Sequence, residues 1–306
     1  MRFVVCGEAL IDLMQEEELS SAESRWIARS GGGPLNTAAA LAKLGCDSHF
    51  LGRISSDAFG RQLRSHLAAA NVNLGLAVHT DDPTSVAVVS LDEQGKASYT
   101  FHFDQTSNFN WRKEEFPELD GDDWLHFGSI GAVIGPGAKP VLNFINRTDA
   151  AVSYDLNVRP SCLPDRQEYF GLVTDLMRAV GNHGGIVKAS DEDIAWLVDD
   201  DGDPLSFAGA WAEEFGLAMF IVTLGADGVV AVKPDGRRIK VPGFAVDVED
   251  TVGAGDTFMA GFLSAYAEDP DDVPAALTRG AAAAAIVCTR KGAQPPTAAE
   301  VDAFLG

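Results

Sequence analysis

Short apolar runs alternate with longer stretches of mixed polarity along most of this chain. The apolar runs suit strands buried on both faces, and they lie at 2–7, 150–156, 185–190, 218–225 and 228–233. Helical periodicity follows most of them, at 34–45, 57–71, 137–147, 166–180, 191–198 and 205–216, and again at 256–267 and 273–290. This alternation predicts an α/β fold with a mainly parallel central sheet that helices cover.

Two segments interrupt the alternation. Residues 15–30 follow a strand without leading into a helix, and residues 84–104 alternate apolar and polar positions around a turn at 92–95. We therefore expect an α/β core of residues 1–14, 31–83 and 105–306, with 15–30 and 84–104 forming a small β-sheet lid. The exposed edge of such a sheet would suit a homodimer formed through the lid.

Composition narrows the function classes. The chain has 306 residues, of which 46% are hydrophobic, so one large domain can bury a core. The formal net charge of −22 argues against nucleic-acid and membrane partners, which need a basic face, and is typical of a solvated surface suited to solubility or high salt. The apolar run at 280–288 is too short to span a membrane, and the first residues do not resemble a signal peptide, so a cytoplasmic location is expected.

The four cysteines do not suggest a metal or redox site. No two of them form a C-x-x-C pair, which argues against zinc-ribbon and thioredoxin-like proteins. Cys6 and Cys288 lie in apolar runs, so we expect both to be buried as small hydrophobic residues.

The stretch DTVGAGDTFMAG at 250–261 carries the most specific chemistry. Its small residues, Gly253, Ala254 and Gly255, precede a helical run, so their N–H groups and the helix dipole suit an anion. Asp256 at the head of that helix would accept a proton beside these donors, as transfer of a phosphoryl group to a hydroxyl requires. The alternative is structural: an acidic residue at a helix start and a turn residue at Asp250.

Two glycine-containing motifs near the N-terminus, GEALID and GGGPLN, suit a polyol. Asp12 lies just past the first strand, residues 31–33 are glycines that permit close approach, and Asn36 offers a donor and an acceptor. The alternative is a flexible loop that leads into a helix. The chain lacks both the Walker A pattern and G-x-G-x-x-G, which argues against a P-loop enzyme and a nicotinamide dehydrogenase.

DLNVRP and VTLGADG follow two of the expected strands. Asn157 and Arg159 are expected to alternate on an extended segment, and Arg159 would clamp a phosphate or pair with a surface carboxylate. Gly225 and Gly228 would let the backbone approach a nucleotide, or simply form a turn.

Together these motifs resemble those of the ribokinase-like sugar kinases, the PfkB family. GGGPLNTA and DTVGAGDTF resemble its two signatures, with GRISSDAFG, DLNVRP, VKASDED and VTLGADG between them, so the resemblance covers essentially the whole chain. It implies a three-layer α/β/α fold and transfer of the γ-phosphoryl group of MgATP to a sugar hydroxymethyl. Asp256 would be the catalytic base, the N–H groups of Gly253, Ala254 and Gly255 the anion hole, and Arg159 a residue near the phosphate.

The resemblance also implies the binding residues. Those for sugar are Asp12, Gly32, Gly33, Asn36 and Asn157, and those for the nucleotide are Lys188, Ser190, Thr223, Gly225 and Gly228. Asp193 would reach Mg²⁺ through water, and Asp250 lies where some members hold a monovalent cation such as K⁺. Ser190 and Asp193 stand where many members have Asn and Glu, and Asp193 is shorter by a methylene.

Among these kinases the chain is most similar to fructokinases. A 2-keto-3-deoxygluconate kinase is the main alternative, with Arg159 meeting the substrate carboxylate, and ribokinase is another. A sugar-binding regulator without catalytic activity is the alternative from outside the class, and the presence of Asp256 within an intact loop argues against it.

Overall fold

The computed structural model describes residues 1–91, 97–200 and 202–306. In it, successive residues of β1 (Arg2–Cys6) pack into two different hydrophobic clusters. Val4 and Cys6 belong to one cluster, and Phe3 and Val5 belong to the other. Because side chains alternate along a strand, the sheet that contains β1 is buried on both faces. This is the expected three-layer α/β/α arrangement, and the expected fold class is confirmed.

The central sheet is mainly parallel. Among the described residues its order is β14-β13-β12-β11-β10-β9-β1-β4. The other bounds are β4 (Asp47–Leu51), β9 (Asp123–Gly128), β10 (Ala151–Asp155), β11 (Ile186–Ser190), β12 (Met219–Thr223), β13 (Val229–Val232) and β14 (Arg238–Val241). Pairing is parallel from β4 to β12 and antiparallel at β13 and β14, so six carboxyl ends meet at one edge.

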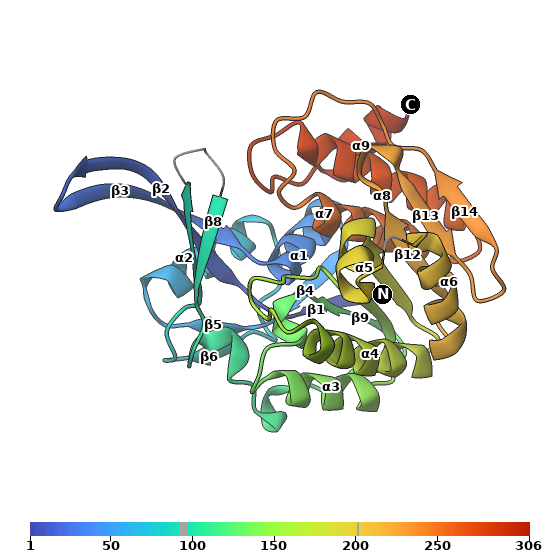
Figure 1. Cartoon of the computed structure of the whole chain (residues 1–306), viewed down its shortest axis with the longest axis horizontal. Helices are drawn as coiled ribbons and strands as arrows, with labels where there is room; N and C mark the ends of the chain where they lie inside the picture. The colour runs from blue at the N-terminus through green and yellow to red at the C-terminus, as the bar shows by residue number, and fades with distance from the viewer. Residues whose placement is uncertain (92–96, 201) are drawn as a thin grey trace.

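Helices cover both faces of this sheet (Figure 1). One face carries α3 (Ala138–Arg147), α4 (Arg166–Asn182), α5 (Asp191–Val198) and α6 (Pro204–Phe215). The other carries α1 (Gly33–Lys43), α2 (Ala58–Ala69), α7 (Ala254–Tyr266), α8 (Val273–Cys288) and α9 (Ala298–Leu305). None of the helices in the described part of the chain has the length and apolar character that crossing a membrane requires.

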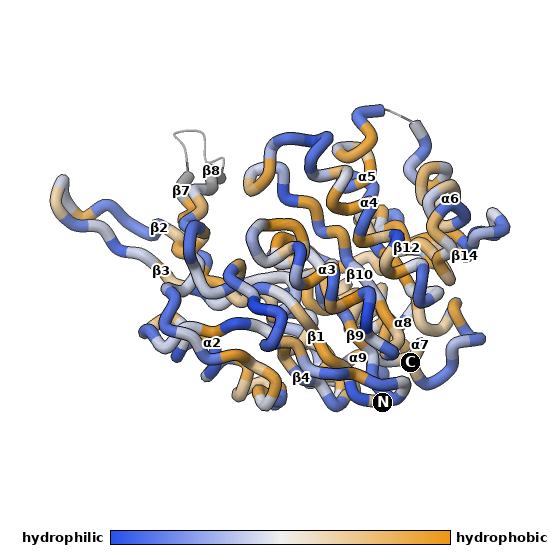
Figure 2. The backbone as a smooth tube through the Cα atoms, turned by 90° about the horizontal axis from the view of Figure 1, so that it is seen from below, coloured by the Kyte–Doolittle hydropathy of each residue, from blue (hydrophilic) through white to orange (hydrophobic). Residues whose placement is uncertain are grey.

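A second sheet stands to one side of these layers (Figures 1 and 2). Its order is β3-β2-β7-β8, from β2 (Leu10–Ser20), β3 (Glu23–Gly31), β7 (Val86–Leu91) and β8 (Ala97–His102). The antiparallel β7–β8 pair agrees with the expected hairpin, whose turn at 92–95 lies outside the described residues. The sheet starts before residue 15, because 11–14 already pair with β7.

Short elements complete the fold. They are the parallel pair β5 (Arg53–Ser55) and β6 (Val78–Thr80), and the 3₁₀ turns η1 (Ser107–Phe109), η2 (Lys113–Glu115), η3 (Ile130–Ala132) and η4 (Gly225–Asp227).

One buried amide, that of Asn108, anchors the second sheet. Its Oδ1 accepts the N–H of Ala9 at 3.1 Å, and its Nδ2 donates to the Ala9 carbonyl and to Ser85 Oγ, both at 2.9 Å. Ala9 precedes β2 and Ser85 precedes β7, so Asn108 fixes both strands where they enter the second sheet.

Candidate active site

A cleft of about 930 Å³ opens along the region where the parallel strands end. All five residues expected to contact a nucleotide line it: Lys188, Ser190, Thr223, Gly225 and Gly228. Its apolar lining comes from Phe244, Ala245, Val246, Val248, Ala281, Ala284 and Ala285. An apolar slot beside convergent polar groups suits a planar base carrying phosphates.

Cys288 also lines the cleft and is only half-buried, so the expectation that it lies in the core is wrong, whereas Cys6 is buried.

The start of α7 provides backbone donors beside this cleft. Gly253 caps the helix at φ 77°, and a Cβ there would lie 2.7 Å from that of Ala293, so both conformation and space require glycine. The Ala254 N–H already donates to the Thr251 carbonyl at 3.2 Å, which withdraws one of the three expected anion donors. The N–H groups of Gly253 and Gly255 donate to no such acceptor within the described chain and remain for an anion.

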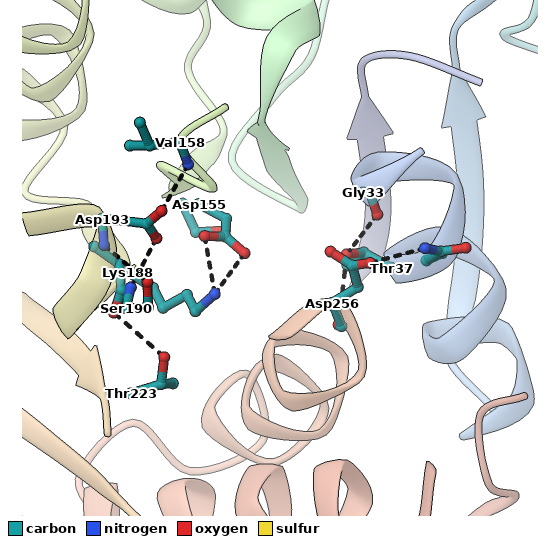
Figure 3. A network of polar contacts seen from close by, with 12 residues as sticks. Gly33, Thr37, Asp155, Val158, Lys188, Ser190, Asp193, Thr223 and Asp256 are labelled. Atoms are coloured by element: carbon teal, nitrogen blue, oxygen red, sulfur yellow. Dashed lines mark hydrogen bonds and ion pairs between the residues drawn. The ribbon is translucent and has the colours of Figure 1, made fainter. Parts of the chain in front are cut away.

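Asp256 occupies the third position of α7 and is 8% exposed. Asn36 Nδ2 donates to its Oδ2 at 2.8 Å, and the Thr37 hydroxyl donates to the Asp256 backbone carbonyl at 3.5 Å, so α1 and α7 are joined here (Figure 3). Burial raises the pKa of Asp256 to about 6, although the hydrogen bond from Asn36 lowers it. At neutral pH the side chain is therefore an ionised carboxylate with a high proton affinity.

The expected sugar-binding residues gather around this carboxylate. A Cβ on Gly33 would lie 2.8 Å from Asn157 Nδ2 and 3.2 Å from Asp256 Oδ1. Asp12 lies inside β2 rather than just past the first strand, and a side chain at Gly31 would collide with its carboxylate. The structure thus brings β2, the start of α1, the segment after β10 and the start of α7 to one place.

Two arginines act on Asp12. Burial raises the pKa of Asp12 to about 6, while the positive charges of Arg159 and Arg29 lower it. Arg29 belongs to β3 and was not among the site residues expected from the sequence. Only the strand pairing shows that Arg29 belongs to the site, because the antiparallel register places it opposite Asp12.

The segment from Asn157 to Arg159 is bent, so the expected extended alternation is wrong. Asn157 has φ 41°. After it, the Val158 N–H donates to Asp193 Oδ1 at 2.9 Å, and the Arg159 N–H donates to Tyr169 Oη at 3.1 Å. These bonds to α5 and α4 turn the backbone. The exposed Arg159 guanidinium has no carboxylate within ion-pair distance in the described chain, so it is available to an anion.

Asp193 holds the backbone in place. Its Oδ1 accepts the Val158 N–H and its Oδ2 accepts the Ser190 N–H, both at 2.9 Å, while Ser190 Oγ caps α5 (Figure 3). Both carboxylate oxygens are therefore already engaged from one side.

Asp250 also shapes the backbone. Its Oδ1 accepts the Val252 N–H at 3.0 Å and its Oδ2 accepts the Gly292 N–H at 2.8 Å, which joins the loop before α7 to the loop after α8. Within the described ranges, no three Asp, Glu, His or Cys side chains are grouped to hold a metal ion.

Asp155 was not selected from the sequence, yet it pairs with Lys188. Lys188 Nζ lies 3.0 Å and 2.9 Å from its two carboxylate oxygens, and these side chains are 5% and 6% exposed (Figure 3). Burial lowers the pKa of Lys188, but the charges of Asp155, Asp193 and Asp256 together with the hydrogen bond to Asp155 raise it above its usual value, so the ammonium stays protonated. A Cβ on Gly255 would lie 2.9 Å from Nζ, which places this ammonium at the start of α7.

Comparison with known proteins extends this picture. Residues 2–300 match the family model described as pfkB family carbohydrate kinase. The chain is 34% identical to a fructokinase of Rhizobium leguminosarum bv. trifolii over 86% of this chain and 79% of that protein. It is 32% identical to a fructokinase of Vibrio alginolyticus over 99% of this chain and 98% of that protein.

Solved structures share the whole architecture. Fructokinase from Vibrio cholerae O395, in a form with fructose, ADP and calcium bound, superposes with a TM-score of 0.85 at 27% identity, covering 100% of this chain and 99% of that one. Aminoimidazole riboside kinase from Salmonella enterica superposes with a TM-score of 0.85 at 25% identity, over 100% and 99% of the two chains.

Proposed function

Because this chain belongs to the pfkB family of carbohydrate kinases and is a sugar phosphotransferase, we propose that it is a fructokinase, which transfers the γ-phosphoryl group of MgATP to a hydroxymethyl group of fructose. One observation carries the proposal. Asp256 is a buried, ionisable carboxylate at a helix N-terminus, joined to the expected sugar residue Asn36 at 2.8 Å. It lies beside the cleft that suits a nucleotide and beside the glycines that border Asp12.

The proposed reaction uses this chain's own groups in three ways. Asp256 accepts the proton of the attacking hydroxyl, since its raised proton affinity favours that transfer. The free N–H groups at the start of α7 bind the oxygens of the moving phosphoryl group, and the Lys188 ammonium stabilises the same charge. Arg159 meets the phosphate from the opposite loop.

The size and the lining of the cleft fit ATP. For Mg²⁺, the cleft offers the side chain of Asp193. Mg²⁺ keeps several waters and usually takes only one or two carboxylates besides phosphate oxygens, so a three-carboxylate group is not required. We propose that Asp193 contacts such a water with the lone pairs that its two backbone donors leave unused. When bound, Mg²⁺ would neutralise phosphate charge. Asp250 remains our candidate beside a K⁺ site.

A coupled ADP-release screen tests the proposal. The purified chain is supplied with saturating MgATP and a panel of ketoses, aldoses, sugar acids and nucleosides. We expect fructose to give the highest kcat/KM. Turnover of another sugar with none on fructose would refute the fructokinase assignment, while the family assignment would stand.

The two arginines near Asp12 favour one second candidate, a 2-keto-3-deoxygluconate kinase. A substrate carboxylate needs a cation, and both Arg159 and Arg29 act on the region around Asp12. For a fructokinase, Arg159→Gln should lower mainly kcat, because the charge that Arg159 stabilises develops during transfer. For an acid kinase, KM for the sugar acid should rise steeply as well, since an unpaired buried carboxylate is costly. Steady-state kinetics with each substrate distinguish the two cases.

Asp12→Ala provides the matching test on the sugar side. A lost charge-assisted contact costs about 1.5–3 kcal/mol, so KM for fructose should rise by roughly 10- to 100-fold, while ATP affinity stays unchanged. A variant with normal fructose KM would contradict a sugar-binding role for Asp12.

We also propose that the second sheet closes over bound sugar and excludes water from the phosphoryl group. Asp12 lies on β2, so a sugar held by Asp12 contacts this sheet directly. Hydrogen exchange at the backbone of 13–29 should slow when fructose binds, while exchange in α4 stays constant. Unchanged exchange at 13–29 with fructose demonstrably bound would contradict closure. Dimerisation through this sheet remains a prediction, which light scattering tests.

A further inference from the structure

Glu8 is a buried carboxyl group that the proposed mechanism does not use. It lies between β1 and β2 and is 1% exposed, within the GEALID motif that also contains Asp12. A carboxyl group is rarely buried without a partner, because its desolvation is costly. Its partners here are the N–H of Gly131, which donates to Oε2 at 2.9 Å, and the side chain of Ser129.

The turn that Glu8 holds is strained. Ser129, at its start, has φ 58° and ψ −155°, an unusual conformation for a residue with a side chain. Such strain costs on the order of 1–3 kcal/mol and persists only where surrounding contacts impose it. The contacts are the Gly131 bond to Glu8 and the Ser129 N–H bond to the Asp155 carbonyl at 3.0 Å.

Glu8 itself and the turn that its carboxyl group holds both border the expected sugar residues. A Cβ on Gly32 would lie 2.6 Å from the Glu8 carbonyl oxygen and 3.4 Å from its Cγ. A Cβ on Gly33 would lie 3.5 Å from Ser129 Cβ. The carboxyl group therefore packs behind the glycine segment and, through Gly131, behind the turn that faces it.

Resting on the proposed function, we propose that Glu8 is a positioning residue for the sugar: its carboxyl group, bonded to Gly131, holds the 129–131 turn against Gly32 and Gly33 and thereby determines sugar affinity rather than phosphoryl transfer. Burial raises the pKa of Glu8 to about 7, which agrees with a role as a hydrogen-bond acceptor that does not require a full charge. A glutamine retains that acceptor.

The test compares KM for sugar with KM for ATP in three variants of the full chain. Glu8→Ala leaves the Gly131 N–H unpaired, and we expect KM for fructose to rise at least ~10-fold with KM for ATP changed by less than ~2-fold. Glu8→Gln should stay within about 3-fold of wild type in both constants. Gly131→Ala keeps the N–H but would place a methyl group 2.7 Å from Oε2, so it should raise the sugar KM like Glu8→Ala.

The double variant Glu8→Ala with Gly131→Ala provides the decisive comparison. If the two residues act as one unit, the double variant should be no worse than the more impaired single variant, because the carboxyl group that the methyl would strike first is absent and only its contacts with the Glu8 nitrogen at 3.0 Å and Gly7 Cα at 3.2 Å remain. Additive effects would overturn the proposal, as would a wild-type sugar KM in Glu8→Ala, or a Glu8→Gln variant as impaired as Glu8→Ala. Thermal melts check folding, and if Glu8→Ala does not fold, Glu8→Gln and Gly131→Ala decide.

The same assay separates this inference from the proposed function. Wild-type turnover on fructose is measured first. If wild type turns over only another sugar, the fructokinase assignment fails and the variants are compared on that sugar, where the same pattern is expected. If no sugar is turned over, both are refuted.

Discussion

Asp256→Asn should lower kcat by about 10²- to 10⁴-fold, the usual contribution of a positioned general base, while ATP affinity changes little. Asparagine preserves the shape and still accepts the hydrogen bond from Asn36, but it does not accept a proton. Rapid-quench or coupled kinetics measure kcat, and calorimetry measures ATP binding. Near-normal turnover would show that another group is the base.

The control is the same substitution at the start of the next helix. Asp272 caps α8 by accepting the Ala275 N–H at 3.0 Å, and asparagine caps as well as aspartate does. Asp272→Asn should therefore leave kcat and stability unchanged. Equal losses in both variants would indicate a general structural effect.

The pH dependence follows from the raised pKa of Asp256. The base must be ionised, so kcat/KM should fall as the pH drops through about 6. Stability should respond in the opposite direction. Because the folded pKa lies above the unfolded value of 3.8, this residue contributes stability at low pH that is lost as the pH rises through about 6. Asp256→Asn should thus melt at or above the wild-type temperature at pH 8.

Asp155→Ala should lower the free energy of unfolding by about 3–5 kcal/mol, since it leaves the Lys188 ammonium buried without its partner. Urea denaturation measures this as a lower midpoint at unchanged m value. The double variant Asp155→Ala with Lys188→Met removes both charges and should recover much of the lost stability. Its kcat should remain low, because the ammonium beside Gly255 is absent.

An exposed pair serves as the control. Asp175 and Arg178 lie 3.3 Å apart on the surface of α4 and are 59% and 56% exposed. Asp175→Ala should not shift the midpoint measurably, because solvent screens such pairs. A small effect of Asp155→Ala, comparable to this control, would contradict the assignment of a buried ion pair.

Some signals were present in the sequence but were not used. Thr297 and Glu300 form a capping box at the start of α9, a pattern that is readable from the residues alone. β9 was missed for a different reason. Asp123 and His126 interrupt its apolar pattern, and their partners, Arg2 and Ser153, come from neighbouring strands.

Local periodicity by itself determined the α/β class, most strands and helices, and the glycine loop that starts α7. A strand buried on both faces gives a short apolar run, and a helix start gives a characteristic set of residues, so each can be recognised within a few residues of the chain. Only the tertiary structure paired Asp155 with Lys188, bent the chain at Asn157, and placed Glu8 behind the glycine segment. Each of these depends on contacts between residues that lie far apart in the chain. The hydrophobic pattern of a single segment does not specify which distant residue will be the partner of a buried charge. Those arrangements are therefore decided only when the segments pack together.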